Sequence, residues 1–218
     1  MTDEGAEVRG LDGRRNQKLR TRRALVDAAV ELVREGRPVT VADAAHKAQV
    51  SVATAYRYFS NPQDLLRETQ TVARGFEALA DLPDDPAERL DLVVSRTADL
   101  QLGDEAVWRA VLRAALERWT DPAADPGTGA GPNTDTEAVP TRNRLRFDLT
   151  RAALEPLADT LPPDLHRRLT MAATMVYGVE ALVSTRDVCG LDPEESKDVM
   201  RWAARALLEA VQREAAER

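Results

Sequence analysis

The sequence has few of the residues that metal sites, disulfides and most enzyme active sites need. It contains one cysteine, Cys189, so no internal disulfide can form and nothing requires an oxidising compartment. The two histidines, His46 and His166, lie far from each other and from Cys189 in the sequence. They are accompanied by no Gly-rich phosphate loop, no paired carboxylates and no nucleophile with a matching base. We therefore expect no metal site, no cofactor and no enzymatic activity.

Long hydrophobic stretches and a secretory leader are also missing. The first ten residues, MTDEGAEVRG, are acidic and have no apolar centre. The longest uncharged hydrophobic stretch, Leu169 to Val179, has eleven residues, which is too few to span a bilayer. The sequence therefore predicts a cytoplasmic protein with no membrane partner.

Aromatic residues are scarce, at 4% of the 218 residues, whereas alanine, leucine, arginine and glutamate are abundant. This composition favours helices over sheets, and a chain of this length buries enough surface to fold without disulfides. The apolar periodicity predicts an all-α protein of about nine helices. We expect an N-terminal three-helix domain followed by a larger helical domain.

The net charge of −7 is unevenly distributed along the chain. Residues 9–60 carry eleven Lys or Arg residues and five Asp or Glu residues, a balance of +6, so the acidity lies elsewhere. A basic end on an acidic protein is expected where that end approaches phosphates. For the cluster from Arg14 to Arg23 alone, a solvated charged helix face fits the sequence equally well.

Residues 40–59, TVADAAHKAQVSVATAYRYF, predict two short helices joined by a tight turn. Thr40 and Asp43 are the residues of a capping box, with Asp43 reaching back to the backbone amide of Thr40. Ser51 is a second N-cap, so the second helix is predicted over Val52 to Tyr58. Two helices at this spacing form a helix-turn-helix candidate. The alternative is a helical hairpin whose tyrosines belong to the core.

The side chains of this motif suit DNA. Threonine and tyrosine hydroxyls bind phosphate oxygens, and Arg57 can reach a guanine edge or a phosphate. Val52, Ala53 and Ala55 can meet thymine methyl groups. We expect Arg57, Val52 and Ala53 to read bases, while the hydroxyl residues hold phosphates. The candidate DNA-binding residues are Thr40, Ser51, Val52, Ala53, Thr54, Tyr56, Arg57, Tyr58, Arg20 and Arg23.

One order of residues runs through the motif and into the next helix: Thr40, Val41, Asp43, Ala45, Ala48, Val50, Ser51, Thr54, Tyr56, Tyr58, Phe59, Leu65 and Leu66. This order closely resembles the DNA-binding domain of TetR-type transcriptional regulators. The segment from Gly178 to Leu208 resembles, more loosely, the dimerising end of the same family. The resemblance implies an all-helical homodimer whose N-terminal domains enter successive major grooves. It also implies that the larger C-terminal domains bind an inducer and dimerise.

Two positions depart from the family pattern. The family usually has glycine in the turn where this chain has Gln49, and a left-handed backbone at a non-glycine residue costs about 1 kcal/mol. The family usually has a phosphate-binding lysine where this chain has Pro62. Asn61 and Pro62 are good N-cap and first-turn residues, so the terminus of the next helix could hold that phosphate instead.

The pattern divides the chain into three parts. Residues 1–13 contain three glycines and no apolar period, which predicts a disordered arm. Residues 14–60 are predicted to form the helix-turn-helix DNA-binding domain, whose first helix begins near Asn16 and ends at Gly36. Residues 61–218 are predicted to form the effector-binding and dimerisation domain.

Two segments of the larger part have special roles in this prediction. A long helix from Asn61 to about Ala80 begins at the DNA-binding domain and ends inside the larger domain. It is the expected lever between the two. Residues 121–140, rich in Gly, Pro, Thr and Asp, predict a flexible loop.

The larger domain carries a stripe of Trp108, Leu112 and Trp119 at helical spacing, with arginines beside it. Such a stripe is more often core than ligand pocket, but tryptophan next to arginine within helices also suits an apolar or anionic effector. The candidate effector-pocket residues are Trp108, Leu112, Trp119, Phe147, Met171, Met175 and Tyr177.

The last two helices are predicted over residues 163–188 and 193–214, antiparallel across a short connection. The segment from Met171 to Ser184 is apolar almost all round, and small residues that allow close helix approach recur on the final helix. Burial within one subunit is one explanation. A second copy of the pair, completing a two-fold four-helix bundle, is the simpler one. The candidate dimer-interface residues are Met171, Gly178, Val199, Trp202, Ala203, Ala206 and Ala210.

These observations predict a bacterial DNA-binding transcriptional regulator, by default a repressor. We expect it to bind an inverted-repeat operator as a homodimer and to be released by a small-molecule effector. Its predicted partners are double-stranded DNA, a second copy of the chain and an effector that the sequence does not identify. The alternative is a DNA-binding dimer without a small-molecule ligand, controlled by a protein partner or acting as an architectural factor.

Overall fold

The computed structural model describes residues 4–68, 79, 81–120 and 144–218. These residues form ten α-helices, a 3-10 turn and a π-helical turn, with no strand among them, which confirms the all-α prediction. No helix within the described ranges is long and apolar enough to cross a membrane. The chain divides into two compact units, residues 1–71 and 72–218.

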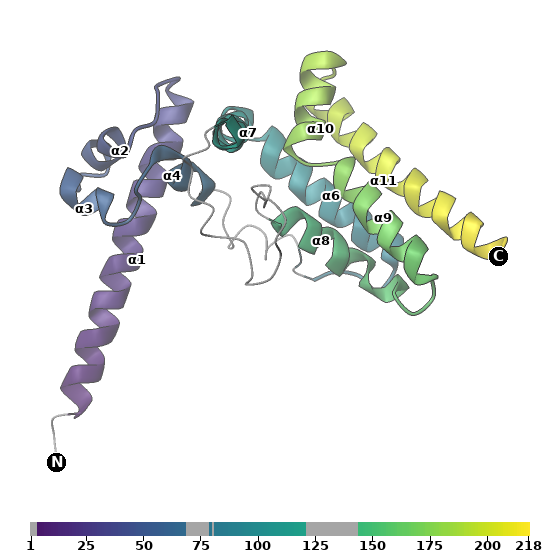
Figure 1. Ribbon diagram of the computed structural model, residues 1–218, viewed down its shortest axis with the longest axis horizontal. Helices are drawn as coiled ribbons and strands as arrows, with labels where there is room; N and C mark the ends of the chain where they lie inside the picture. The colour runs from purple at the N-terminus through teal and green to yellow at the C-terminus, as the bar shows by residue number, and fades with distance from the viewer. Residues whose placement is uncertain (1–3, 69–78, 80, 121–143) are drawn as a thin grey trace. The chain divides into compact units, whose positions relative to one another are not determined.

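The first unit is built from α1 (Glu4–Arg34), α2 (Val41–Lys47), α3 (Val52–Tyr56) and α4 (Pro62–Glu68). α1 packs on α2 and α4, and α2 packs on α3 (Figure 1). One apolar cluster joins them, because the inward side of each helix consists of alanine, leucine or another apolar residue. Its buried members are Leu25, Ala28, Ala29, Leu32, Val41, Ala44, Ala45, Ala55, Phe59 and Leu65. Because α4 packs on α1, the first unit extends past the predicted boundary at residue 60.

α1 starts earlier than predicted. It begins at Glu4, whereas a disordered arm is predicted over residues 1–13. Each glycine there lowers helix stability by about 1 kcal/mol, but the helix extends from an already packed segment and needs no new nucleus. The end of the helix is as predicted: Gly36 has a φ of 68° and its amide donates to the Val33 carbonyl at 2.9 Å.

α4 begins at Pro62, as predicted, and its described part ends at Glu68. The rest of the predicted lever helix lies outside the described residues, apart from Leu79. The Leu79 side chain packs, partly buried, against the core of the second unit. The predicted loop at residues 121–140 also lies outside the described residues.

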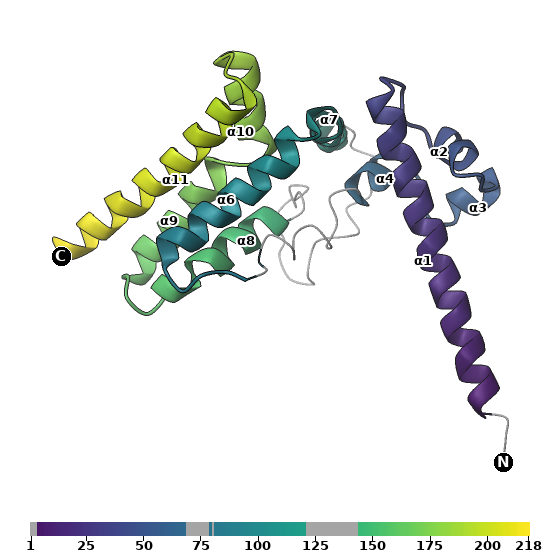
Figure 2. The same cartoon turned by 180° about the vertical axis from the view of Figure 1, so that it is seen from behind.

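The second unit is a helical bundle (Figure 2). α6 (Pro86–Leu102) packs along α11 (Pro193–Ala216) and α8 (Leu145–Leu154), and α9 (Pro163–Met175) packs on α8 and α11. Asp192 and Glu195 form a capping box at the start of α11. The shorter or peripheral elements are α7 (Glu105–Thr120), η1 (Glu155–Leu157), α10 (Val179–Val183) and η2 (Ser184–Val188).

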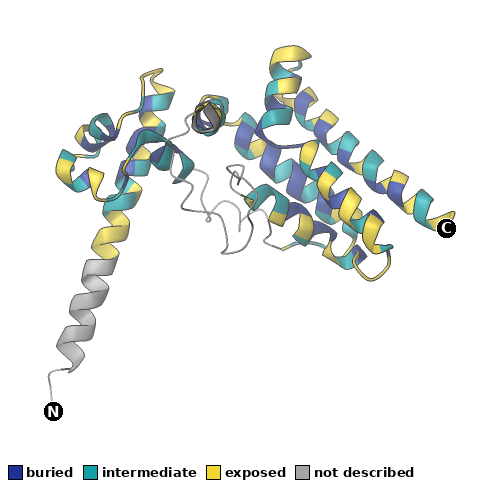
Figure 3. Cartoon of the chain, viewed as in Figure 1, coloured by how far each residue is buried: buried dark blue, intermediate teal, exposed yellow. Residues whose placement is uncertain are grey.

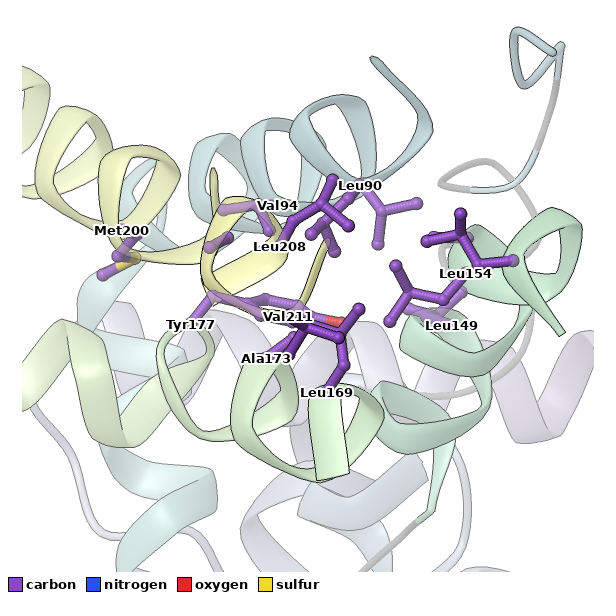
Figure 4. Packing of buried hydrophobic residues seen from close by; sticks show 14 of the residues in the cluster. Leu90, Val94, Leu149, Leu154, Leu169, Ala173, Tyr177, Met200, Leu208 and Val211 are labelled. Atoms are coloured by element: carbon purple, nitrogen blue, oxygen red, sulfur yellow. The ribbon is translucent and has the colours of Figure 1, made fainter. Parts of the chain in front are cut away.

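The core of the second unit is supplied by α6, α8, α9 and α11 (Figure 4). Leucines make up half of its buried residues, and Tyr177 is its largest fully buried side chain. The buried members at its centre include Leu90, Val94, Leu149, Leu154, Leu169, Ala173, Tyr177, Met200, Leu208 and Val211.

The predicted continuous helix over residues 163–188 is wrong. α9 ends at Met175, and Gly178, with a φ of 100°, separates it from α10, which begins at Val179. A φ in this region is open to glycine at little cost and to other residues only with strain. Helical periodicity did not predict this break, because one glycine inside an apolar stretch does not interrupt the period.

Arg146 of α8 forms hydrogen bonds on both sides of this break. Its Nη1 donates to the Tyr177 carbonyl at 3.0 Å and to Glu180 Oε2 at 2.5 Å. A Cβ on Gly178 would lie 2.0 Å from the same Nη1. The guanidinium therefore occupies the space that a side chain at this position would need.

Candidate nucleic-acid interface

Two side-chain caps fix where α2 and α3 begin. The Thr40 hydroxyl accepts from the Asp43 amide at 2.9 Å, and the Ser51 hydroxyl accepts from the Thr54 amide at 3.2 Å. Both predicted N-caps are thus confirmed. The return bond of the predicted capping box differs, because the Asp43 carboxylate accepts from the Thr40 hydroxyl at 2.6 Å.

The two caps also differ in where their hydroxyl protons go. Ser51 Oγ donates to Thr54 Oγ1 at 2.8 Å, so the Thr54 hydroxyl keeps its own proton for an outside acceptor. The Thr40 hydroxyl already donates to Asp43. Thr54 is therefore better placed than Thr40 to donate to a phosphate oxygen.

The turn between α2 and α3 contains one left-handed residue. Gln49 has a φ of 55°, and its amide donates to the His46 carbonyl at 3.1 Å. The Val50 amide donates to the Ala45 carbonyl at 2.9 Å. This pair of bonds closes α2 in a Schellman motif, whose left-handed residue is usually glycine. The left-handed backbone expected at Gln49 is thus confirmed, with a strain of about 1 kcal/mol.

α3 turns a short polar side toward solvent (Figure 3). Ala53 and Arg57 are exposed, and Tyr56 is 52% exposed. Ala55 is fully buried in the core, so the prediction that it meets a thymine methyl group is wrong. The helix is also shorter than predicted: it ends at Tyr56 with Arg57 as its C-cap, and residue 58 lies in the following turn.

Two further candidates at α3 offer DNA only part of their surface. Val52 and Tyr58 are half-buried and pack against the core of the unit. A tyrosine in this position can pack its ring inward while its hydroxyl stays available for a hydrogen bond. Tyr58 therefore remains compatible with a phosphate contact, whereas Val52 has less surface available for a base.

Arg22 of α1 contacts α4 and the residue that follows the turn after α3. Its guanidinium donates to both carboxylate oxygens of Glu68, at 2.8 and 2.9 Å, and lies 4.8 Å from the centre of the Phe59 ring. The hydrogen bonds from Arg22 lower the pKa of the Glu68 carboxyl from its ordinary value. The sequence does not reveal this pair, because its members are 46 residues apart.

Other basic residues of this unit are also paired within the chain. Lys47 pairs with Glu31 at 3.2 Å and with Glu35 at 2.6 Å. Arg37 pairs with Glu35 at 3.4 Å. The balance of +6 counted over residues 9–60 therefore overstates the positive charge that is available to a partner.

The basic residues proposed for DNA are those that point to solvent. Arg20 and Arg57 are exposed and have no ion-pair partner within the part of the chain that the structure describes. Arg23 is exposed too, and its contact with Asp27 is long, at 4.0 Å between Nε and Oδ2. All three remain available for phosphates or base edges.

The start of α4 is capped by the chain itself. Asn61 Oδ1 accepts from the Asp64 amide at 2.7 Å, which confirms Asn61 as the N-cap. The Asp64 carboxylate accepts from Asn61 Nδ2 at 2.9 Å and from the Ser60 hydroxyl at 3.1 Å. The Asp64 carboxylate thus adds a negative charge beside this terminus. The phosphate contact expected there in place of the family's lysine stays a prediction.

The predicted effector-pocket residues differ in how far they are buried. Trp108 is buried on α7, and its indole N–H donates to the Leu100 carbonyl at 3.2 Å. Tyr177 is buried between α8 and α9, with its hydroxyl 2.8 Å from Thr150 Oγ1, and burial raises the pKa of Tyr177 to about 12.

The other pocket candidates have different surroundings. Met171 and Met175 are 47% and 76% exposed on α9. Leu112 and Phe147 are half-buried, and the side chain of Trp119 lies outside what the structure describes. The two methionines therefore belong to an outer surface of the unit in a single copy of the chain.

The predicted dimer residues lie mainly on one side of α11. Its other side is buried in the core of its own chain, through Ser196, Met200, Ala204 and Leu208. Gly178 is the exception, since it is buried beneath Arg146 and cannot meet a second copy. The exposed or half-buried members are Met171, Val199, Trp202, Ala203, Ala206 and Ala210.

Comparison with known proteins identifies the fold. No protein-family model matches the chain, and no curated protein matches it. Among solved structures, it is similar to a TetR transcriptional regulator from Rhodococcus sp. RHA1. The likeness covers 88% of this chain and 97% of that one, with a TM-score of 0.57 and 19% sequence identity. The chain thus has the all-helical fold of a TetR transcriptional regulator.

Proposed function

We propose that the chain is a DNA-binding transcriptional regulator, a repressor that binds an inverted-repeat operator as a homodimer and is released by a small-molecule effector. The observation that carries this proposal is the exposed side of α3, formed by Ala53, Tyr56 and Arg57. α3 is the second helix of a helix-turn-helix, the element that enters the major groove in such motifs. The fold shared with a TetR regulator supports the same assignment.

The contacts can be divided by chemistry. Arg57 reads a guanine edge, because its guanidinium is unpaired and can form a bidentate hydrogen bond there. Thr54 donates to a phosphate, with Ser51 supplying the hydrogen bond that orients its hydroxyl. Tyr56 contacts a phosphate or a thymine methyl. The small side chain of Ala53 lets α3 come close to the wall of the major groove.

A second copy of the chain covers the exposed side of α11. Trp202 is 68% exposed there, between the small residues Ala203 and Ala206 and the apolar Val199. A large aromatic side chain surrounded by small residues is typical of an interface anchor. A two-fold dimer then requires two half-sites in inverted orientation, separated by about 34 Å or more.

The proposed effector acts through a difference in affinity between two states of the dimer. A coupling of about 1 to 3 kcal/mol is enough to change operator occupancy severalfold to a hundredfold. Trp108 is buried in the second unit, so its fluorescence is a suitable reporter. Quenching by one compound within a broad panel supports an effector, and an unchanged signal throughout would favour control by a protein partner.

The test of the proposed function is a DNA-retention experiment. Fragmented DNA from the source organism is incubated with the purified protein, and the retained fragments are sequenced. We expect one inverted-repeat motif, recovered by the wild-type protein and depleted with Arg57→Ala. A matched control is Arg167→Ala, because Arg167 is an exposed arginine on α9.

The alternative outcome is equally clear. If the retained DNA contains no shared motif and binding fades uniformly with salt, the first unit is a non-specific phosphate binder. That result would contradict the proposed operator-specific repressor and favour an architectural role.

A further inference from the structure

The core of the second unit changes from apolar to polar at one end. Val94 and Ala98 belong to the buried stripe of α6, and Gln101, one turn further on, continues this stripe at only 5% exposure. On α11, Ser196 lies four residues before the buried Met200 and is itself fully buried. The buried stripes of both helices therefore end in a polar side chain.

The end of α6 lies beside the start of α11. Lys197 Nζ lies 2.6 Å from Asp99 Oδ1, and Arg201 Nη2 lies 2.7 Å from Asp91 Oδ2. The ion pair that comes later on α6 comes earlier on α11, so the two helices run antiparallel. They also pack along each other, which brings their polar ends together.

Gln101 and Ser196 are at the same level of the bundle. Each is at most two residues from the ion pair of Asp99 with Lys197, which is about 3 Å along its helix. Both are buried, whereas Asp99 is exposed, so both side chains point into the unit. Gln101 Oε1 and Ser196 Oγ are buried and have no hydrogen-bond partner within the described part of the chain.

Stability does not explain these two unpaired atoms. A buried polar atom without a partner lowers the folding equilibrium constant about fivefold to a hundredfold, and native proteins leave few such atoms. Replacing both side chains by apolar ones of similar size would remove this cost. Two unpaired polar atoms at one level of a core are expected where a bound molecule supplies the missing hydrogen bonds.

The charged side chains near this end favour a neutral molecule, because they pair with one another. Those of α6, α7, η2 and α11 form three close ion pairs: Arg186 with Glu105 at 2.7 Å, Arg109 with Asp187 at 2.6 Å, and Lys197 with Asp99 at 2.6 Å. An ionic ligand would have to compete with these pairs, whereas a neutral ligand leaves them intact.

The two unpaired atoms favour a hydroxyl group. The amide oxygen of Gln101 can only accept a hydrogen bond, while the Ser196 hydroxyl can donate one. A hydroxyl group satisfies both, since it donates to Gln101 and accepts from Ser196. Trp108 lies close by, because its indole N–H donates to the carbonyl of Leu100, the residue before Gln101. With its N–H already paired, the Trp108 ring offers apolar surface to the body of the ligand.

We propose that the polar end of this core, formed by Gln101, Ser196 and Trp108, binds the hydroxyl group of a small neutral alcohol or phenol. The proposal deepens the effector part of the function proposed above and rests on it for its regulatory consequence. Ser196 faces this site from one side of α11, and Trp202 lies on the exposed side of the same helix. A ligand that repositions α11 therefore changes the proposed dimer surface.

The test is titration calorimetry of the full-length protein with phenol and with 1-butanol. Each probe has a control without a hydrogen-bond donor: benzene for phenol, and diethyl ether, an isomer of 1-butanol. The variant combines Gln101→Met, which keeps a long side chain without the amide, with Ser196→Ala. The control variant is Thr185→Val, because the buried Thr185 hydroxyl is already paired with the carbonyls of Ala181 and Leu182.

We expect the wild-type protein to bind both probes, and the double variant to bind them about tenfold more weakly or worse, because two hydrogen bonds are lost. Benzene and diethyl ether should bind the wild type more weakly than their partners, and Thr185→Val should bind like the wild type. Without a probe, the double variant should unfold at the same or a higher temperature than the wild type, since it has no unpaired atoms at this level.

Several results would overturn the proposal. Equal binding of phenol and benzene, or undiminished binding by the double variant, would show that the two unpaired atoms hold no hydroxyl. Absence of probe binding with operator binding intact would remove the site and leave the regulator. If, in addition, the double variant unfolded at a lower temperature, a buried water would account for the two atoms instead. Absence of operator binding would remove the proposed function, while calorimetry, which needs no DNA, would still decide the site.

Discussion

The two units of the chain are built alike inside and present different chemistry outside. Both cores consist of alanine, leucine and other apolar side chains from packed helices. On the first unit, α3 exposes Tyr56 and Arg57, and α1 exposes Lys18, Arg20 and Arg23. On the second unit, α9 and α11 expose Met175, Trp202 and Val199.

This contrast supports a different proposed partner for each unit. A polar, basic surface loses little by staying in water and gains by meeting phosphates. A surface that exposes methionine and tryptophan gains about 25 cal/mol for each Å² of apolar area it buries. We therefore infer that DNA covers the first surface and that a second copy covers the other. The predictions below are ordered from the largest expected effect to the smallest.

The largest effect is expected at Trp202, where a charged substitution disrupts the exposed apolar surface of the second unit. Truncating an interface tryptophan costs about 2 kcal/mol or more, and a two-fold dimer contains two copies. Trp202→Glu should therefore weaken dimerisation by at least about 4 kcal/mol, a thousandfold or more in the dissociation constant. Sedimentation velocity over a range of protein concentrations measures this change.

The control is Leu116→Glu, which places the same charge at an exposed apolar residue of α7. That variant should remain as dimeric as the wild type. Both variants should keep their helical content, since neither side chain is buried in the described core. A Trp202→Glu protein that stays dimeric would place the second copy on another surface.

The next largest effect is expected for a substitution on the polar surface of the first unit. Arg57→Ala should weaken operator binding by about 1 to 3 kcal/mol and relax the base preference, because a bidentate contact to a guanine carries sequence information. Fluorescence anisotropy on operator and scrambled duplexes measures both quantities.

Thr54→Ala provides the comparison within α3. Its hydroxyl is expected to bind a phosphate, so its loss should weaken all duplexes by a similar factor. Equal losses on operator and scrambled DNA for Arg57→Ala would show that this residue does not read bases.

The contact of Arg22 with Glu68 connects the polar surface to the core of its unit, and its effect on stability depends on pH. The pKa of Glu68 is lowered in the folded state from an ordinary value of 4.5. A lowered carboxyl pKa contributes stability that is fully present above the unfolded value and is lost as pH falls through the folded value. Because both side chains are about one-third exposed, we expect only about 1 kcal/mol.

Urea unfolding of Glu68→Gln, compared with the wild type, measures this contribution. The variant should be less stable at pH 7, and the difference should shrink as the pH is lowered below about 4.5. Asp27→Asn is a control from the same unit, because the contact of Asp27 with Arg23 is long and exposed. A difference for Glu68→Gln that stays constant with pH would rule out the ion pair as its cause.

The sequence predicted best what depends on local spacing. Thr40, Ser51 and Asn61 cap their helices because a short polar side chain before an apolar period has one favourable role. The exposed stripe of α11 was also predicted from helical periodicity alone. Ala55 was misplaced because its neighbours in the sequence do not show which side of a five-residue helix faces the core.

What the sequence could not predict depends on residues far apart in the chain. Glu68 neutralises Arg22 and Glu35 neutralises Lys47, so counting charges overstated the free basic groups. The break at Gly178 is contacted by Arg146, which comes from another helix. Periodicity describes one helix at a time, whereas both features arise where two helices meet.

The smallest expected effect concerns the turn that sets the angle of α3. Gln49→Gly should remove the left-handed strain of about 1 kcal/mol and give back part of it through the greater freedom of the unfolded chain, a net gain of about 0.5 kcal/mol. Urea unfolding measures it. Asp81, with a φ of 51° in the second unit, is the matched control. Aspartate tolerates this conformation better than glutamine, so Asp81→Gly should gain less. An equal gain at both positions would show that relief of backbone strain alone, and not the residue that carries it, decides the effect.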